Sequence, residues 1–432
     1  MYVSCRKSQK TTKTLLCTVV FLLITCRTAT ETYWLFFSWS AGLLSLISNA
    51  ISLGLLFTLP FWFYKTCSIK KLRELLMPLY LLLLIIVLKH IVLIAEYGGL
   101  GFLSPSFYSS YPNFPEGFYI MGLQRWLTIG SLIMWIVYEI DSKAILNKCL
   151  KVSAIAFLIP IILMIVCRPD LIGLRLVLVD NVFFGGGFWN IGVRGFLAFG
   201  WLWILMYFDK SQSNRKLFLA AAIISVVSGC FGVSRAIIVS VSMAILFYIL
   251  FNIKSTRPIK VILTVAICVF AVYLFFGNTF IDAFIDRFKN LNDVSSLEEE
   301  SRFLIWKSYL SNISDYLFFG APIGSYFRYA IPPKFCSPHS SPMLWLVQYG
   351  VFALIAYLSL LWKIVRNSKL LNKDISHNIL LWLITYISIT FINESGYFTT
   401  ETYIGLALVF STINIYLSEQ KENREEQRIQ VR

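Results

Sequence analysis

Long apolar stretches recur along the whole chain and constrain its fold more than any other feature. A helix needs about 20 mostly apolar residues to cross a bilayer, and we predict about twelve such spans. They lie at 14–30, 40–63, 75–95, 121–140, 152–167, 190–208, 217–234, 236–252, 261–278, 343–362, 378–394 and 402–418. The first span also fits a cleavable signal peptide, although we favour a retained helix. The sequence therefore predicts an all-helical integral membrane protein.

The composition excludes two broad classes of protein. Hydrophobic residues make up 57% of the 432 residues and charged residues 14%, whereas soluble domains carry about 25% charged residues. A soluble enzyme is therefore excluded, and the high hydrophobicity also excludes a disordered chain. The nine cysteines form no CxxC pair, so we expect neither a structural zinc site nor a full disulfide framework.

The distribution of positive charge predicts the orientation in the membrane. The formal net charge is +15, from 38 Lys and Arg against 23 Asp and Glu. In the twelve-span layout, 25 of the 38 basic residues fall in the two termini and in every second loop. Lysine and arginine collect in cytoplasmic loops, so we expect both termini in the cytoplasm. The positive charge then needs no nucleic-acid partner.

The same layout divides the chain into four parts. Residues 1–278 hold the first nine spans, 279–342 form a large outward loop, 343–418 hold the last three spans, and 419–432 form a charged cytoplasmic tail. A helix is expected in the loop from Ser301 to about Leu317. Because long loops on rigid scaffolds often carry function, we expect the functional site on the outward side.

Thirteen basic residues remain that the orientation does not explain. Arginine binds phosphates through a planar fork that stays charged, so the arginines among them are candidate anion-binding groups. Snorkelling or structural ion pairs are the alternative explanation. The arginines that we single out are Arg125, Arg194, Arg235, Arg287 and Arg302. Lys89 and His90 lie deep in an apolar helix, where a hydrogen-bonded core histidine is favoured over a proton-handling one.

The chain has three histidines, at positions 90, 339 and 377. His377 falls in a predicted cytoplasmic loop. His339 follows Pro338 at the outward mouth of the tenth span. Imidazole suits general-base chemistry near neutral pH, so His339 is the candidate base on the outward side.

Several short motifs resemble the bacterial O-antigen ligases and polymerases. His339-Ser340, nine residues, and then Gly350-Val351-Phe352-Ala353 resembles the ligase signature, in which the last position is Gly, Thr or Tyr. Ser301-Arg302 with Trp306, the segment 319–324 and Ser234-Arg235 resemble other parts of the shared domain. The resemblance covers roughly residues 180 to 365.

This resemblance implies a polytopic enzyme of the bacterial inner membrane, with a loop folded over a lipid-facing cavity. The enzyme would move a glycan from undecaprenyl diphosphate to an acceptor sugar hydroxyl at the periplasmic face. His339 would accept the hydroxyl proton, while Arg235 and Arg302 stabilise the diphosphate. Substrate-binding residues would be Arg125, Arg194, Arg287 and Ser340. No metal, ATP or other cofactor is expected.

Other functions stay open at this point. We favour a polymerase, whose acceptor is another lipid-linked glycan, over a ligase, whose acceptor is lipid A–core. A transporter or flippase of the same substrate is the alternative from another class, because intramembrane charges also suit transport. A non-catalytic membrane scaffold is the third. Expected partners are membrane lipid and a chain-length regulator.

Overall fold

The computed structural model describes most of the chain as helices. The described residues are 2–28, 40–97, 118–167, 176–179, 182–185, 187–231, 235–252, 270, 301–321, 338–392 and 399–430. The elements are α1 (Tyr2–Thr28), α3 (Ser40–Ser68), α4 (Lys70–Tyr97), α6 (Phe118–Glu139), α7 (Lys143–Cys167), β1 (Leu176–Val179), β2 (Val182–Gly185), α8 (Gly187–Gly195), η2 (Phe196–Gly200), α9 (Trp201–Phe208), α10 (Arg215–Phe231), α11 (Arg235–Phe251), α14 (Ser301–Ser311), η4 (Ile313–Asp315), α15 (Ser341–Ser368), α16 (Lys373–Ile392) and α18 (Thr400–Gln430).

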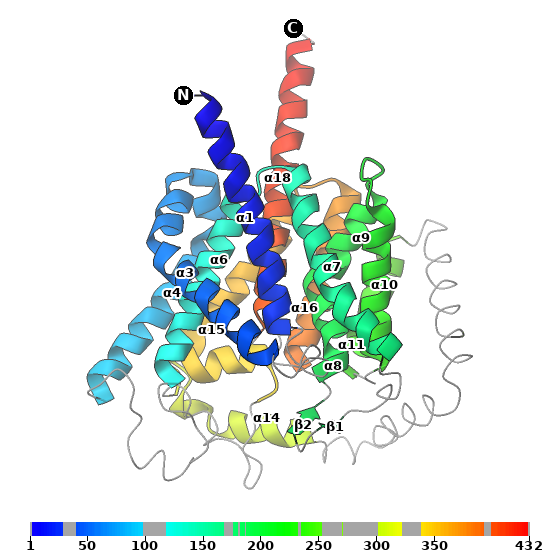
Figure 1. Ribbon diagram of the computed structural model, residues 1–432. Helices are drawn as coiled ribbons and strands as arrows, with labels where there is room; N and C mark the ends of the chain where they lie inside the picture. The colour runs from blue at the N-terminus through cyan, green and yellow to red at the C-terminus, as the bar shows by residue number, and fades with distance from the viewer. Residues whose placement is uncertain are drawn as a thin grey trace.

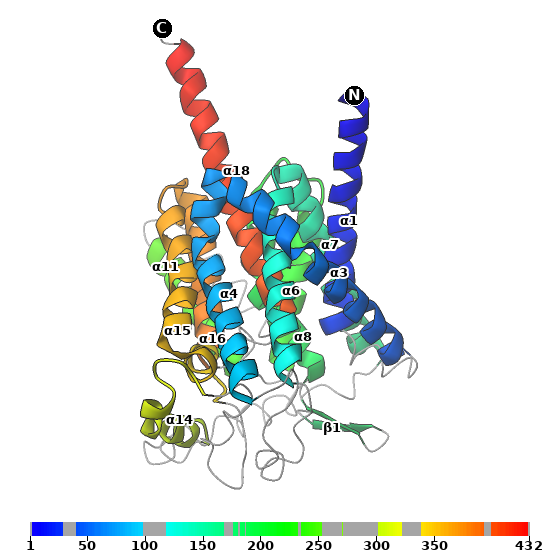
Figure 2. The same cartoon turned by 90° about the vertical axis from the view of Figure 1, so that its left-hand side faces the viewer.

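The long helices form a bundle with two different ends (Figure 1). Both termini lie at one end, which we call the terminal end, and α14 with the β1–β2 hairpin lies at the other, the loop end. Figure 2 shows the same division from the side. Helix α18 contacts α1, α6, α7, α8 and α15, whereas α3 packs on α6, α4 on α15 and α11 on α16. The bundle therefore forms around α18.

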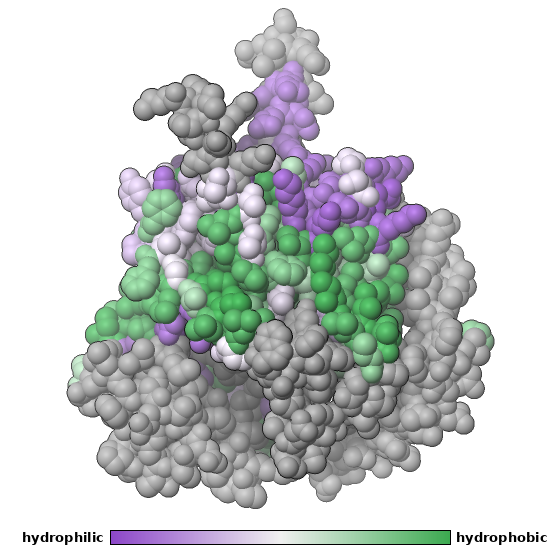
Figure 3. All heavy atoms as spheres, in the orientation of Figure 1, coloured by the Kyte–Doolittle hydropathy of each residue, from purple (hydrophilic) through white to green (hydrophobic). Residues whose placement is uncertain are grey.

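The surface between the two ends is apolar, as a bilayer requires. Figure 3 shows hydrophobic side chains across the middle of the bundle and polar ones at the terminal end. Among the described residues, five helices are long and apolar enough to cross a membrane, at Gly42–Ser68, Lys70–Val92, Lys143–Cys167, Ile191–Phe208 and Ser341–Ser368. The prediction of a helical membrane protein is confirmed.

The positions of the helices follow the predicted spans closely. A helix lies at each predicted span except the ninth, residues 261–278, of which only residue 270 is among the described residues. The helix expected from Ser301 does begin there, but it ends at Ser311 and is followed by the short turn η4. The segment 168–189 adds the small β1–β2 hairpin to an otherwise helical structure. The count of twelve spans and the four-part division stay predictions.

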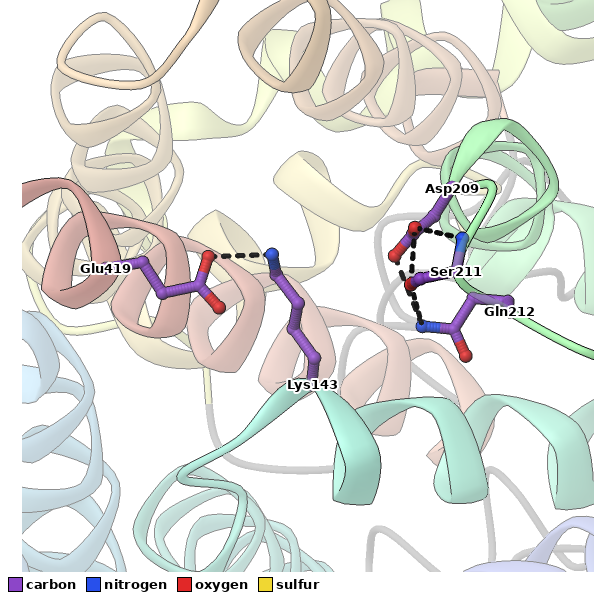
Figure 4. A network of polar contacts seen from close by, with 5 residues as sticks. All are labelled: Lys143, Asp209, Ser211, Gln212 and Glu419. Carbon is purple, nitrogen blue, oxygen red and sulfur yellow. Dashed lines mark hydrogen bonds and ion pairs between the residues drawn. The ribbon is translucent and has the colours of Figure 1, made fainter. Parts of the chain in front are cut away.

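Polar contacts join the helices at the terminal end. In Figure 4, Nζ of Lys143 lies 2.7 Å from Oε2 of Glu419, and Ser211 and Gln212 donate hydrogen bonds to Asp209. Burial raises the pKa of the Asp209 carboxyl, but these hydrogen bonds and the charge of Lys143 outweigh it and hold the pKa below its usual value. These groups lie where the sequence predicts basic cytoplasmic loops.

The sixth predicted span is interrupted by a π-helix. Residues 196–200 form η2 between α8 and α9, and a π-helical turn displaces backbone carbonyls from the regular ladder. The indole of Trp382 donates a hydrogen bond of 3.0 Å to the carbonyl oxygen of Ala198. Helix α16 thus supplies a hydrogen-bond donor to one carbonyl oxygen of η2. The π-helix begins two residues after Arg194.

Candidate active site

Helix α15 consists of two helical segments that meet at Gly350. This glycine has φ 80° and ψ −178°, which are not helical values. A β-carbon at this position would lie 2.1 Å from the carbonyl oxygen of Phe318, and a positive φ also disfavours any side chain. The glycine of the histidine motif is therefore required by the break in α15 and by the close approach of residue 318.

The chain segment 316–321 crosses α15 at this break. The amide of Ala321 donates to the carbonyl of Val347 at 2.6 Å, and the amide of Val351 donates to the carbonyl of Leu317 at 2.7 Å. These bonds replace intrahelical bonds that the break removes. We call this contact between 316–321 and 347–351 the seam. It fastens residues 316–321 to α15.

The Lys89 side chain, in α4, makes a further contact with the seam. Its Nζ donates a 2.9 Å hydrogen bond to the carbonyl oxygen of Gly320. Gly320 itself has φ +73° and leaves no room for a β-carbon against the backbone of Gln348. This contact explains a lysine in an apolar stretch of α4 without assigning it a role in chemistry.

A second contact lies at the start of α15, beside His339. The indole of Trp306 in α14 donates a 2.7 Å hydrogen bond to the carbonyl oxygen of Pro338. His339 follows with a positive φ of 47°, and the buried Ser340 precedes the first residue of α15. Arg302 lies one helical turn before Trp306 in α14. The chain segments that carry Arg302 and His339 are therefore joined directly.

Two more candidate arginines lie near the first turn of α18. Nη1 of Arg194, in the last turn of α8, lies 3.9 Å from Oε1 of Glu401. Arg125 of α6 lies over the ring of Trp126, 5.8 Å from its centroid, and Trp126 meets Tyr403 edge-on at 5.6 Å. Helices α6, α8 and α18 thus bring Arg125, Arg194 and Glu401 to the same region of the loop end.

The remaining predicted residues are placed less fully. Arg235 is the first residue of α11, and α10 ends at Phe231. Arg287 lies outside the described residues. The roles of all these residues in binding or catalysis stay predictions.

The other two histidines lie in settings unlike that of His339. His90 is buried, and its Nδ1 lies 2.7 Å from the carbonyl oxygen of Ile86, as expected for a hydrogen-bonded core histidine. His377 stacks on Phe251 at 4.6 Å at the terminal end. Burial, assisted by the charge of Lys373, lowers the pKa of His377. His339 is half-buried and lies at the loop end, whereas His377 is half-buried at the terminal end.

Glu401 is a charged residue of this region that the sequence did not single out. Its signal in the sequence is an acidic residue directly before an apolar stretch, which is unusual in a membrane helix. Within the described ranges, no group of three or more His, Cys, Asp or Glu side chains is arranged to hold a metal ion.

Comparison with known families agrees with this geometry. No curated protein matches the chain. Residues 220–358 match the O-antigen ligase family, a segment that includes Arg235, Arg302, the seam and His339 but neither Arg194 nor Glu401. The resemblance to this superfamily is thereby confirmed over residues 220–358.

Proposed function

We propose that this protein is an inner-membrane glycosyltransferase that acts on a lipid-linked glycan at the periplasmic face, as an O-antigen polymerase. The donor would be a glycan on undecaprenyl diphosphate, and the acceptor the sugar hydroxyl of a second lipid-linked glycan. The observation that carries the proposal is the hydrogen bond from Trp306 to the carbonyl of Pro338. It joins the helix that carries Arg302 to the residue before His339, and this supports a site that uses both a cation and a base.

The proposed reaction needs one proton acceptor and positive charge. The imidazole of His339 takes the proton from the acceptor hydroxyl, whose oxygen then bonds to the anomeric carbon of the donor sugar. The bond from that carbon to the diphosphate oxygen breaks, and the diphosphate leaves with the electron pair. Arg235 and Arg302 stabilise the charge that develops on it. Arg125, Arg194, Arg287 and Ser340 are proposed to bind the substrates.

The proposed orientation puts the terminal end in the cytoplasm. Lys13, Lys71 and Lys143 all make their polar contacts at that end, in agreement with the positive-inside rule. The loop end then faces the periplasm, where the proposed transfer from a lipid-linked donor needs no ATP. A chain-length regulator is a proposed partner.

The direct test is transfer in detergent with purified protein and a lipid-linked repeat unit as both donor and acceptor. We expect products of increasing length. Products that form only with lipid A–core as acceptor would indicate the ligase instead. Because detergent abolishes any membrane gradient, turnover there excludes a pure transporter, and no turnover with either acceptor contradicts the proposal.

The arginine role has its own matched pair of variants. Arg302→Lys keeps the charge but loses the planar fork that binds phosphate bidentately, so we expect transfer to fall roughly tenfold or more. Lys307→Gln removes an exposed charge from the same helix and should leave the rate unchanged. Wild-type transfer by the Arg302→Lys variant would contradict the bidentate role.

A further inference from the structure

The ion pair between Arg194 and Glu401 is unevenly buried. The side chain of Glu401 is 3% exposed, whereas that of Arg194 is 26% exposed. A carboxylate in an apolar bundle is costly unless a cation compensates it. Glu401 therefore needs Arg194, whereas the Arg194 side chain keeps an open, partly exposed side.

The backbones around the pair hold the two residues at a fixed separation. Gly405, one turn after Glu401, lies so close to Ala198 that a β-carbon would be 2.3 Å from the Ala198 carbonyl oxygen. The same oxygen accepts the hydrogen bond from Trp382. Helices α16 and α18 thus both fix η2, which directly follows the turn of Arg194. The backbones that carry Arg194 and Glu401 are therefore held in fixed positions relative to each other.

The distance itself is informative. At 3.9 Å the nitrogen and oxygen are beyond hydrogen-bond range. Glu401 therefore attracts the guanidinium by its charge and does not use up the donors of the fork. Arginine has five N–H donors in a planar arrangement that suits phosphate oxygens, so an anion can bind on the open side.

We propose that Glu401 is a positioning residue, which holds the guanidinium of Arg194 in place to bind a phosphate group of the substrate at the loop end. That this phosphate belongs to a lipid diphosphate rests on the proposed function. The competing explanation is a purely structural pair, in which each charge only neutralises the other.

Three variants separate these explanations. Glu401→Gln removes the fixing charge, and Glu401→Asp keeps it on a shorter side chain. The double variant Arg194→Met/Glu401→Leu replaces both charges with apolar groups, a change that buried ion pairs often tolerate. The control is Lys143→Met/Glu419→Leu, which removes the half-exposed pair at the terminal end. Each variant is measured for its melting temperature, for KM and kcat of transfer, and for direct binding of undecaprenyl diphosphate.

We expect Glu401→Gln to raise KM for the donor roughly tenfold with a smaller change in kcat, and Glu401→Asp to recover most of this loss. The double variant should melt like wild type yet bind undecaprenyl diphosphate at least tenfold more weakly, while the control binds normally. Wild-type KM and binding in the double variant would overturn the proposal, as would an unchanged KM in Glu401→Gln.

The binding measurement keeps this proposal separate from the proposed function. If the wild-type protein binds undecaprenyl diphosphate but transfers no glycan, the proposed function fails and Glu401 is still tested by binding. If transfer proceeds but neither KM nor binding responds to Glu401, the positioning role fails and the proposed function stands.

Discussion

The two ends of the bundle carry charged side chains in contrasting settings. At the terminal end, Lys13 pairs with Asp141 and Lys143 with Glu419, at 2.8 and 2.7 Å, and all four side chains are partly exposed. At the loop end, the carboxylate of Glu401 is buried and its cation lies 3.9 Å away. The carboxylates of the two close pairs are therefore exposed, whereas the carboxylate of the looser pair is buried.

We infer different roles for the charged residues at the two ends. Exposed ion pairs contribute about 0 to 1 kcal/mol to stability, so the terminal-end pairs suit residues whose main task is orientation in the membrane. At the loop end, by contrast, Trp306 and Lys89 donate hydrogen bonds to backbone carbonyls, and Glu401 is buried. These contacts hold the groups in fixed positions. Changes at the loop end should therefore affect activity, and matched changes elsewhere should not.

The largest effect is expected at His339. His339→Ala removes the proposed base, and loss of a general base lowers rates by about 100- to 10,000-fold. His377→Ala, the matched change at the terminal end, should leave transfer unchanged. The measurement is glycan transfer by purified protein, with the melting temperature recorded for both. Full transfer by the His339 variant would remove the contrast between the two ends.

The next largest effect is on stability, at Gly350. Gly350→Ala puts a β-carbon against the Phe318 carbonyl at a positive φ, so we expect unfolding to become easier by about 3 kcal/mol. Gly42→Ala in α3, where no atom lies within 4 Å of the new β-carbon, is the control and should be neutral or slightly stabilising. Thermal unfolding in detergent compares them, and equal melting temperatures would contradict the seam.

A smaller effect is expected at Trp306. Trp306→Phe keeps an aromatic ring but removes the N–H that holds the carbonyl of Pro338, a bond worth about 0.5 to 1.5 kcal/mol. If that energy holds His339 in place, kcat should fall by roughly 2- to 10-fold. Trp362→Phe, at an exposed position on the outside of α15, serves as the control. A drop of similar size in both variants would indicate a general requirement for tryptophan.

The smallest effect is expected for the pair of Lys143 and Glu419. A double-mutant cycle to alanine should give a coupling energy under about 1 kcal/mol, and raising the salt concentration should reduce it. Unfolding in detergent at low and high salt measures both quantities. A coupling of several kcal/mol would mean that the terminal end also depends on its charges.

Helix positions were largely predictable from the sequence, because membrane spans need long apolar stretches that leave a strong signal. The positions of His339 before α15 and of Arg235 at the start of α11 were predictable for the same reason, since they follow from where spans end. The break in α15 was not, because Gly350 stands in an apolar run that continues as helix on both sides. Its conformation depends on residues 316–321, which are distant along the chain.

The contacts at the site were also not predictable from the local sequence. Nothing near Trp306 indicates that its indole binds the carbonyl of Pro338, since that contact requires the fold of the intervening loop. Glu401 was missed for a different reason: the positive charges were counted and the negative ones in the helices were not. The interruption at η2 depends on Trp382 and Gly405 from other helices, so no local pattern predicts it.

Two sets of contacts fix the length of the chain between residue 338 and the break in α15. Residue 338 is held by Trp306 and residues 347–351 by the seam, so the helical turns between them have a fixed length. Inserting or deleting one residue there would rotate His339 by about 100° relative to Gly350 and could not be absorbed at either anchor. The nine-residue spacing of the motif is thus a dimension of the site, and sequences sharing this seam should vary in the identity of those nine residues far more readily than in their number.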